Sequence, residues 1–393
     1  SFFQACNEPL LEEETVSENQ LKSASGKKSY IVVLNDKNLN DELSKEKGYE
    51  KKKNIVKAAS ANILKRSRVL DGEVEHLYGS ALKGFSVKIP PGQLKKLQDD
   101  PSVSYIEEDK IVSLVLPKVK PDKPGGGKPD KGGGGNESIP AQETPWGITR
   151  VNGGLSATGK TAWIIDSGID LDHPDLNVDT GKSESFLSGK EGNNPDDQNG
   201  HGTHVAGTIA AIDNTEGVIG VAAGAKVVAV RVLDRRGSGS TSGVIAGVDY
   251  VANNASKEDV ANMSLGGGVS TALDEAVLAA STSCPFVLAA GNESDNANNH
   301  SPARANGGNI YTVSAMWDDD SWASFSNYGN PPIDYCAPGV YILSTYKNGG
   351  YETLHGTSMA APHVAGILLL GSISTDGTVS GDPDENADPI AVH

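Results

Sequence analysis

The sequence predicts an α/β protein in which a parallel sheet lies between two layers of helices, with a small α+β domain in front of it. Three observations lead to this prediction. From residue 161 onward, apolar runs of strand length alternate with helical runs, which is typical of a parallel sheet covered on both faces. Residues 30–107 follow a different order, β-α-β-β-α-β. A Pro/Gly/Lys-rich stretch at 117–135 separates the two patterns.

The small domain, residues 29–116, is predicted to be ferredoxin-like. The polar segment before it, residues 1–28, is expected to be disordered. The domain starts with a strand at 30–34 and continues with a Lys-rich amphipathic helix at 39–65. The remaining elements are expected to be strands at 74–78 and 84–89, a short helix at 91–98 and a last strand at 103–107.

The large domain, residues 141–393, follows a linker at 117–140 that we expect to be extended and easily cut. Its strands are expected at 161–165, 226–232, 260–264 and 286–290, and its helices at 202–211, 242–253 and 271–283. In a parallel sheet of this kind, reactive groups gather at the carboxyl ends of the strands. The candidate functional residues below all follow a strand or begin a helix.

The net charge of the chain and its distribution argue against some classes of function. The 393-residue chain has a formal net charge of −17 and a pI near 4.9, which argues against nucleic-acid binding as its main activity. Residues 1–131 hold 23 Lys and Arg against 20 Asp and Glu, whereas residues 132–393 hold 11 against 31. This asymmetry favours association of the two parts and leaves carboxylates for hard cations. No apolar run reaches 18 residues, so no transmembrane segment is expected.

Three cysteines are too few for a disulfide framework, and no C-x-x-C zinc pattern occurs. Cys284 and Cys336 are equally compatible with one disulfide and with two buried thiols. The first residues, Ser-Phe-Phe-Gln-Ala-Cys, resemble the end of a bacterial lipoprotein signal, which would make Cys6 a lipid acceptor. The alternative for this segment is an ordinary disordered N-terminus.

A serine at the start of an apolar helix is the central candidate. Residues 354–366 read Leu-His-Gly-Thr-Ser-Met-Ala-Ala-Pro-His-Val-Ala-Gly. Gly356 lets the backbone pass close to its surroundings. Ser358 then opens an apolar helical run, where unpaired N–H groups and the helix dipole favour a developing oxyanion. Pro362 falls in or near the first turn, where a missing N–H costs least. A hydroxyl alone is inert, so a base and an orienting acid are also required.

Both partners have candidates. Asp166 ends a buried strand and precedes a turn glycine, which suits a carboxylate that fixes one tautomer of an imidazole; a turn aspartate is the alternative. His201 begins a helix between two glycines that clear space around it. Its spacing from His204 allows a shared helix face, as in metal sites. However, the Glu of a His-Glu-x-x-His motif is absent, and no third ligand is evident, so His204 is expected to be structural.

Asn292 follows the strand at 286–290, where its amide can donate to an oxyanion beside the Ser358 N–H. A turn asparagine is the alternative if it is considered in isolation. Together, the chain order Asp, His, Asn, Ser is one of the known orders for a serine hydrolase.

With these motifs in place, the sequence resembles the subtilases, the subtilisin-type serine proteases, and most of all their proteinase K branch. The resemblance covers about residues 141–371. It rests on the motifs around Asp166, His201, Asn292 and Ser358 and on Ser-Phe-Ser-Asn-Tyr-Gly at 324–329. Residues 30–116 are similar to the inhibitor-type propeptide of that family, including Phe-Ser-Val at 85–87 and Val-Ser-Tyr-Ile-Glu-Glu-Asp at 103–109.

The resemblance implies acyl transfer to Ser358, with His201 as general base, Asp166 as its orienting acid and Asn292 as an oxyanion donor. Segments 237–240 and 264–267 match the strands that bind an extended peptide. Segments 264–268 and 289–291 match the walls of the S1 pocket. Small, apolar walls without an acidic floor favour a large neutral P1 side chain. The substrate-binding residues implied are Gly237, Ser238, Gly239, Ser264, Leu265, Gly266, Gly267, Ala290 and Gly291.

The resemblance also implies a structural calcium ion, held by Asp334 and the backbone carbonyls of Gly308 and Ile310, and no catalytic metal. The acidic stretches 318–320 and 382–385 are either further ligands or solvated turns.

The layout of a slightly basic α/β unit, a cuttable tether and an acidic hydrolase predicts a propeptide that aids folding and inhibits until it is removed. The tail after Ile111 is expected in the cleft as a product-like strand, and self-cleavage by Ser358 is expected near 136–141. We therefore predict a monomeric, extracellular or cell-surface bacterial endopeptidase acting on proteins and peptides. Two alternatives remain: a catalytically silent binding protein, and another acyl-transfer enzyme such as a peptide ligase or an esterase. The Gly-x-Ser-x-Gly elbow of α/β-hydrolases is absent.

Overall fold

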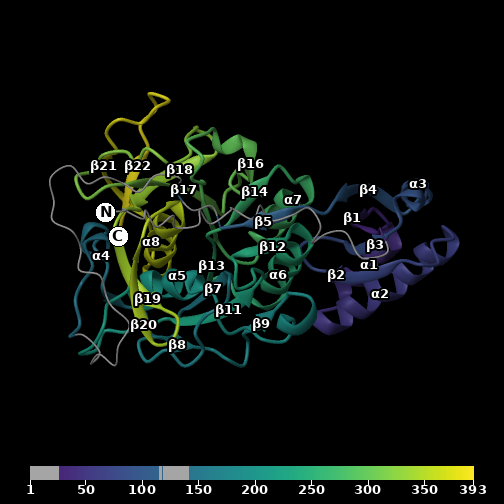
Figure 1. Ribbon diagram of the computed structural model, residues 1–393, viewed down its shortest axis with the longest axis horizontal. Coiled ribbons are helices and arrows are strands. Elements are labelled where there is room, and N and C mark those ends of the chain that lie inside the picture. The colour runs from purple at the N-terminus through teal and green to yellow at the C-terminus, as the bar shows by residue number, and fades with distance from the viewer. Residues whose placement is uncertain (1–25, 115–116, 118–140) are drawn as a thin grey trace, which may run out of the picture.

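The computed structural model describes residues 26–114, residue 117 and residues 141–393. Figure 1 shows a small unit that contains β1 to β4 beside a larger one that contains the remaining sheets. Cys6 and almost all of the predicted linker lie outside the described residues. None of the helices in the described ranges is long and apolar enough to cross a membrane.

The small unit is a four-stranded sheet with helices on one face, as predicted. Its strand order is β2-β3-β1-β4, with antiparallel neighbours. The strands are β1 (Lys28–Leu34), β2 (Glu73–Tyr78), β3 (Gly84–Ile89) and β4 (Val103–Glu108). The helices are α1 (Lys37–Lys45), α2 (Tyr49–Arg66) and α3 (Leu94–Gln98), the last preceded by the 3₁₀ turn η2 (Pro91–Gln93).

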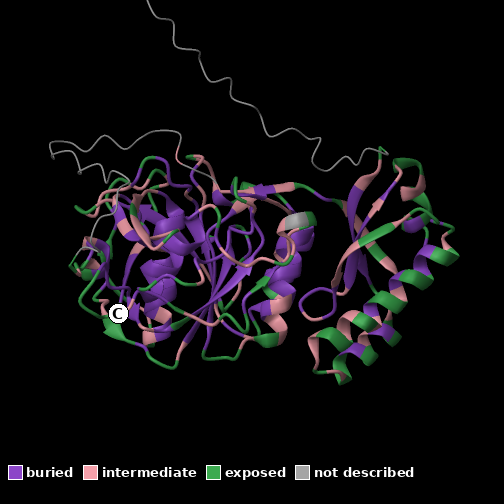
Figure 2. Cartoon of the chain, turned by 60° about the horizontal axis from the view of Figure 1, so that its bottom comes forward, coloured by how far each residue is buried: buried purple, intermediate pink, exposed green. Residues whose placement is uncertain are grey.

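Strand β1 buries both of its faces. Tyr30, Val32 and Leu34 pack against α1 and α2 in the core of the small unit. Ile31 and Val33 point the other way because side chains alternate along a strand, and they join a core of the large unit. The helices α1 and α2, by contrast, alternate between buried and exposed residues, with their outer sides open to solvent (Figure 2). The sheet is therefore the face through which the small unit packs on the large one.

The prediction of a single helix at 39–65 was wrong. The chain forms α1 and α2 with a break at Glu46 to Gly48, where the backbone is extended. The Glu46 carboxylate accepts the N–H groups of Lys47 and Gly48 at 2.9 and 3.2 Å. These local bonds replace the helical ones, and glycine is a poor helix former, so the amphipathic pattern continues across a turn.

The large unit is a three-layer structure around one sheet, which confirms the predicted fold class. The strand order is β21-β22-β18-β17-β15-β13-β7-β11-β8, and β9 also pairs with β11. Pairing is parallel from β8 to β22. The predicted strands are observed as β7 (Thr161–Asp166), β11 (Lys226–Arg231), β13 (Val260–Met263) and β15 (Phe286–Ala289). The strands that extend the sheet are β8 (Asn177–Val178), β9 (Glu184–Ser185), β17 (Ile310–Met316), β18 (Ile333–Pro338), β21 (Ser374–Thr378) and β22 (Pro389–Val392).

The helices divide between the two faces of this sheet. Helices α5 (His201–Ala210) and α8 (Thr357–Leu370) share a core with Ala162 and Ile164 of β7. Helices α6 (Thr241–Asn254) and α7 (Thr271–Ala280) share the other core with Trp163 and Ile165, the alternate residues of the same strand. The small unit lies against α6 and α7 (Figure 1).

A second sheet joins the two units. Its order is β12-β5-β14-β16, formed by β12 (Ser238–Ser240), β5 (Ile111–Ser113), β14 (Gly266–Gly268) and β16 (His300–Ser301). The remaining elements are the hairpin β19 (Ile342–Tyr346) and β20 (Gly350–Leu354), the pair β6 (Leu155–Ser156) and β10 (Ala222–Ala223), helix α4 (Trp146–Arg150), and the turns η3 (Gly189–Glu191) and η4 (Ala297–Asn299). Cys284 and Cys336 are both buried free thiols, so the predicted alternative of a disulfide between them is not formed.

Candidate active site

Asp166 and His201 meet at the carboxyl end of the central strand. Asp166 is the last residue of β7, and His201 is the first of α5. The Nδ1 atom of His201 lies 2.9 and 3.0 Å from the two carboxylate oxygens of Asp166. Both side chains are buried, at 0 and 4% exposure, and the Ser167 N–H also donates to Asp166. The contact fixes which ring nitrogen faces the carboxylate and leaves Nε2 for other partners.

A second aspartate, which the sequence analysis missed, shapes the loop that carries His201. Buried Asp197 accepts hydrogen bonds from the N–H groups of Asn199, Gly200 and Thr203 and from the hydroxyls of Thr203 and Ser167. Asp197 lies ahead of Gly200, which is the N-cap residue of α5, so no helix-cap pattern in the sequence marks it. The role of Asp197 is to fix the entry into α5.

Gly202 allows a close backbone contact, which is a different role from the predicted one of clearing space around His201. A Cβ atom at this position would lie 2.1 Å from the Gly168 carbonyl oxygen. Glycine is therefore needed where α5 passes the turn after Asp166, since any side chain would push the two elements apart.

Ser358 is the second residue of α8 and is buried, at 6% exposure. Its hydroxyl donates to the Ser264 carbonyl oxygen at 3.2 Å, while the Ser264 hydroxyl donates to the Ser358 carbonyl oxygen at 2.9 Å. Within the described part of the chain, the Ser358 hydroxyl makes this bond in place of one to His201. A hydroxyl turns about one bond, and catalytic hydrogen bonds often tighten only when substrate is bound.

Asn292 lies beside the start of α8 in a fixed orientation. Its side-chain oxygen accepts the Thr357 N–H at 2.8 Å and the Thr357 hydroxyl at 3.1 Å. Because these contacts occupy the oxygen, the NH₂ group is the donor that Asn292 offers in the pocket it lines with Ser358. Thr357 was not singled out in the sequence, although it directly precedes Ser358 there.

The predicted peptide-binding segments lie on either side of one strand. In the described structure, β5 pairs antiparallel with β12 on one side and β14 on the other. Val112 stands opposite Gly239 and Gly267, and the Leu114 N–H donates to the Gly237 carbonyl oxygen at 2.9 Å. The expectation that the tail after Ile111 lies in the cleft as a strand is confirmed.

The pocket next to Ser358 differs from the prediction in one respect. It is lined by predicted residues, among them Leu265, Gly266, Ala290 and Gly291. It is also lined by Glu293 and His300. The small, apolar walls are present as expected, and Glu293 adds a carboxylate to the lining that was not expected. Glu293 directly follows Asn292 in the sequence, whereas His300 reaches the pocket only through the pairing of β16 with β14.

The small unit contacts the helices behind the cleft through carboxylates. Asp109 accepts the N–H and the hydroxyl of Ser242 in the first turn of α6, at 2.9 and 2.6 Å. Glu107 accepts the Ala272 N–H in the first turn of α7 at 3.2 Å. In the opposite direction, Asp249 of α6 accepts N–H groups from residues 79–82 of the small unit. These contacts satisfy N–H groups that a helix start or a loop would otherwise leave unpaired.

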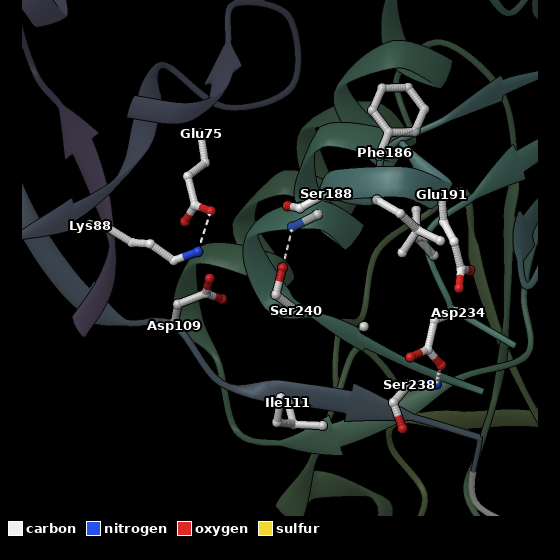
Figure 3. A pocket seen from close by; sticks show the side chains of 14 residues that line it. Glu75, Lys88, Asp109, Ile111, Phe186, Ser188, Glu191, Asp234, Ser238 and Ser240 are labelled. Carbon is white, nitrogen blue, oxygen red and sulfur yellow. Dashed lines mark hydrogen bonds and ion pairs between the residues drawn. The ribbon is translucent and has the colours of Figure 1, made fainter. Parts of the chain in front are cut away.

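A polar cavity remains between the two units (Figure 3). Glu75, Lys88 and Asp109 of the small unit face it from one side, and the Lys88 ammonium lies 2.7 Å from the Glu75 carboxylate. Glu191 and Asp234 of the large unit line the other side, and Ile111, Ser238 and Ser240 line its base along β5 and β12. Both units contribute walls, so the cavity exists only while they are joined.

The predicted calcium ligands come from β18 and from the residues at the start of its neighbour β17. Asp334 of β18 accepts the Thr312 N–H of β17 at 2.9 Å, and β17 begins at Ile310, two residues after Gly308. Burial raises the pKa of Asp334 to about 6, with only the Thr312 N–H acting against it. Among the described residues no cationic group lowers the pKa of this half-buried carboxylate, which fits a ligand for a hard cation. The described residues hold no group of three or more His, Cys, Asp or Glu side chains suited to a metal ion.

The other metal candidates have protein partners. His204 is buried and its Nε2 lies 3.0 and 3.1 Å from the carbonyl oxygens of Ile342 and Glu352, as expected for a structural residue. Asp320 pairs with Arg150 at 2.8 Å, and Asp382 accepts N–H groups from its own loop. Both acidic stretches thus act as turns or ion-pair partners in this structure.

Comparison with known proteins agrees with this geometry. The model of the subtilase family matches residues 159–372, and that of the peptidase inhibitor I9 family matches residues 29–115. An "Alkaline serine exoprotease A" of Vibrio alginolyticus is 44% identical over 312 residues, which are 76% of this chain and 53% of that protein. The chain thus spans about half the length of this relative.

Other relatives are matched over most of their length. A "Subtilisin-like serine protease AsES" of Sarocladium strictum is 39% identical over 347 residues, covering 82% of this chain and 84% of that protein. An "M-protease" of Shouchella clausii is 39% identical over 315 residues, covering 78% and 73%. The crystal structure of a cold-adapted subtilisin-like serine proteinase, 40% identical, aligns with a TM-score of 0.54 over 62% of this chain and 96% of that one. The chain therefore belongs to the subtilase family of serine proteases, and its small unit is an inhibitor I9 propeptide domain.

Proposed function

We propose that this chain is the zymogen of a secreted serine endopeptidase that hydrolyses peptide bonds through an acyl-enzyme formed on Ser358. The observation that carries the proposal is that two groups lie at the carboxyl ends of strands in one parallel sheet: Asp166 with His201 at β7, and Asn292 with the start of α8 just after β15. Asp166 contacts His201 at 2.9 Å, and Asn292 is anchored by the residue next to Ser358. All four are buried, so charges that form there are weakly screened.

In the proposed mechanism, Ser358 Oγ attacks the scissile carbonyl carbon while His201 Nε2 takes the hydroxyl proton. Asp166 holds the imidazole through Nδ1 and stabilises its protonated form. The carbonyl oxygen becomes an oxyanion beside the Asn292 NH₂ group and the Ser358 N–H in the first turn of α8. His201 then gives its proton to the leaving amine. Water releases the acyl group by the reverse sequence, which regenerates the hydroxyl.

The proposed substrates are extended peptides that add a strand between β12 and β14. The propeptide segment β5 supports this because it already pairs with both strands. Main-chain pairing gives affinity without reading sequence, so we propose broad specificity with selection mainly at P1. Leu265, Ala290 and Ala303 offer apolar contact for a large neutral P1 side chain.

A direct test combines active-site labelling with product analysis. A fluorophosphonate should label the processed wild-type protein on Ser358 and leave Ser358→Ala unlabelled. Wild type should hydrolyse casein and peptide substrates. If the wild-type protein is neither labelled nor active, the chain is a catalytically silent binding protein. If a peptide with an added amine gives mainly the aminolysis product, the enzyme is a ligase instead.

We further propose that the first self-cleavage falls within a few residues after Leu114, rather than near 136–141. Strand β5 runs antiparallel to β14 and so toward Ser264, whose carbonyl oxygen contacts Ser358 Oγ. The chain at 118–140 lies outside the described residues, so the earlier expectation stays a prediction. The intact mass of the released propeptide decides between them, since later trimming of the mature N-terminus does not alter it. A Ser358→Ala variant should remain uncut in a protease-free preparation.

We propose a structural calcium ion at Asp334 with the carbonyl groups of Gly308 and Ile310. The support is that Asp334 lies on β18, which pairs with the strand that begins at Ile310, and that among the described residues no cationic group lowers the pKa of Asp334. Calcium should raise the thermal midpoint of Ser358→Ala protein by several degrees, and Asp334→Asn should abolish most of that rise. Equal stabilisation of both proteins would place the ion elsewhere.

We propose that the enzyme is monomeric and extracellular or on the surface of a bacterium, with Cys6 as a lipid attachment point. The Vibrio relative is named an exoprotease, and the N-terminal residues resemble a lipoprotein signal end. Fractionation of producing cells tests the location. Fatty-acid labelling of wild type and Cys6→Ser tests lipid attachment, and light scattering of the purified protein tests whether it is monomeric.

A further inference from the structure

Two hydrogen bonds tie the start of helix α8 to the chain that leaves strand β18. The Gly356 N–H donates to the Gly339 carbonyl oxygen at 2.8 Å. The Tyr341 N–H donates to Nδ1 of His355 at 3.0 Å. The second bond uses a side chain to which the proposed mechanism gives no role, although His355 comes directly before the N-cap residue of α8.

Gly356, that N-cap residue, lies against both proposed oxyanion donors. A Cβ atom built on it would lie 3.2 Å from Nδ2 of Asn292 and 3.6 Å from the Ser358 N atom. The Gly356 carbonyl oxygen accepts the Met359 N–H at 2.9 Å, in the first turn of the helix. Because protein interiors are close-packed, a shift of Gly356 moves the two donors relative to each other.

Tyr341 has a backbone conformation that its surroundings must hold. Its φ angle is 53°, in the left-handed region that bulky residues rarely adopt, and such a conformation persists only where neighbouring contacts maintain it. The Tyr341 and His355 rings meet edge to face, with their centroids 4.6 Å apart. The indole N–H of Trp146 lies 3.1 and 3.3 Å from the carbonyl oxygens of Val340 and Tyr341. The hydrogen bond to His355 is thus one of the contacts that maintain this turn.

This hydrogen bond exists only while the imidazole of His355 is neutral. Nδ1 accepts the Tyr341 N–H, so the proton of the neutral ring is on Nε2, and in an imidazolium two N–H groups would face each other. Burial lowers the pKa of His355 below its ordinary value of 6.5, and no charged side chain among the described residues contributes to that shift. The Tyr341 phenol, which packs on the ring, stays neutral in this pH range. The bond is therefore present at neutral pH and is lost as the pH falls through this lowered pKa.

We propose that His355 is a positioning residue for catalysis: its neutral ring holds the turn at Tyr341 and thereby keeps Gly356 in place beside the two oxyanion donors. This inference rests on the proposed function, because it takes Asn292 and the Ser358 N–H as those donors. The donors act on charge that develops in the transition state, so their displacement lowers kcat and leaves KM unchanged. Proton uptake by the ring has the same effect as removal of its acceptor nitrogen.

The test compares processed wild type with His355→Asn and His355→Leu on one peptide substrate from about pH 5 to 8.5. Asparagine reaches as far with Oδ1 as histidine does with Nδ1, so it keeps an acceptor that does not titrate, whereas leucine has a methyl group there. At pH 8.5, kcat of His355→Asn should stay within about twofold of wild type. The kcat of His355→Leu should fall about 5- to 10-fold with KM unchanged, as expected for one lost hydrogen bond. Titration of active sites with a fluorophosphonate gives the enzyme concentration, so unfolded protein is not counted.

The pH dependence separates this role from simple packing. Titration of His201 affects the three enzymes equally and cancels in the ratios of their kcat values. As the pH falls from 8.5 to 5, the ratio of His355→Asn to wild type should rise about 5- to 10-fold, and that of His355→Leu to wild type should rise toward one. The control His393→Gln, at the exposed chain end, should follow wild type at every pH.

The inference is overturned, and the protease assignment left intact, if both ratios are flat with pH. The same holds if His355→Asn is as impaired as His355→Leu at pH 8.5, or if the loss in His355→Leu is found in KM alone. Should His355→Leu fail to mature, the pH dependence of the ratio of His355→Asn to wild type decides. Failure of wild type to hydrolyse any peptide would instead refute the proposed function.

Discussion

Replacing Asp249 should release the propeptide while leaving the catalytic groups untouched. This aspartate is on α6 of the large unit and is fully buried. Its carboxylate accepts the N–H groups of Ser80 and Ala81 at 2.7 Å, of Gly79 at 3.1 Å and of Leu82 at 3.4 Å. One side chain of the protease thus satisfies four backbone donors of its inhibitor.

The expected loss of binding free energy can be worked out from these hydrogen bonds. Three of the four are short enough to be full hydrogen bonds, and each such bond to a charged group in a buried contact contributes roughly 1–1.5 kcal/mol net. Asp249→Ala removes them and leaves the loop N–H groups without acceptors. The expected loss is therefore about 3–4 kcal/mol of binding free energy, a rise in the inhibition constant of about 10²- to 10³-fold. Asp249→Asn, which keeps one oxygen acceptor, should lose less.

The assay measures inhibition of the processed enzyme by a separate peptide of residues 26–114, with a chromogenic substrate as reporter. Any cost of folding the isolated peptide is the same for every enzyme variant and cancels in the comparison. Glu258→Gln is the matched control, because it removes the same charge from an exposed pair with Lys160. Its inhibition constant should stay within about twofold of wild type, as expected for a surface ion pair.

The reasoning is refuted if Asp249→Ala binds the propeptide as tightly as wild type while its kcat/KM is unchanged. A variant that cannot mature would be replaced by Asp249→Asn, for which the same comparison applies. Equal weakening by Asp249→Ala and Glu258→Gln would mean that long-range charge attraction, rather than the local hydrogen bonds, holds the propeptide.

Three further results are expected. Asn292→Ala should lower kcat by about 10²- to 10³-fold with little change in KM, because its amide is needed only when the oxyanion forms; a large rise in KM alone would contradict this. Burial lowers the pKa of His363 to about 4, below its ordinary value of 6.5, so the stability it contributes is present above pH 6.5 and is lost as pH falls toward 4. In a Ser358→Ala background, urea unfolding should show a loss between pH 7.5 and 5 that is about 2 kcal/mol larger with His363 than with His363→Gln. Gly202→Ala should reduce stability by about 2–4 kcal/mol, since its Cβ would lie 2.1 Å from the Gly168 oxygen, and a thermal midpoint equal to that of wild type would disprove the tight contact.

The positions of the proposed catalytic groups were predictable because each follows a local rule. Asp166 ends an apolar strand, His201 and Ser358 begin helices, and a parallel sheet brings such ends to one edge. The central strands and helices of the large unit were likewise predicted to within a few residues at their ends. Sequence periodicity is enough to predict an element when its apolar residues follow one clear period and pack into a core.

What the sequence did not reveal depends on contacts between distant segments. His300 reaches the pocket through the pairing of β16 with β14, and no local pattern marks that register. Strand β22 adds to the sheet beside β18, although it is only four residues long, pairs with β18 at Cys336 and Ile390 alone, and follows an acidic loop. Whether such a short segment forms a strand depends on the segments packed beside it more than on its own β propensity. Gly48 was a sequence signal for the break between α1 and α2. The amphipathic pattern on both sides of it nevertheless led to the prediction of a single helix.

The apolar run at 30–34 shows how the propeptide packs onto the large unit while it also fills its own core. A strand exposed on one face would alternate between buried and exposed residues. Ile31 and Val33 are nevertheless buried like Val32, because α6 and α7 cover the second face. The same contact brings Asp109 and Glu107 to the first turns of those helices, where N–H groups lack partners. Each such cap contributes about 1 kcal/mol. In the folded chain the propeptide therefore stabilises the first turns of α6 and α7, and the strand that follows, β5, pairs between β12 and β14 as a direct continuation of that contact.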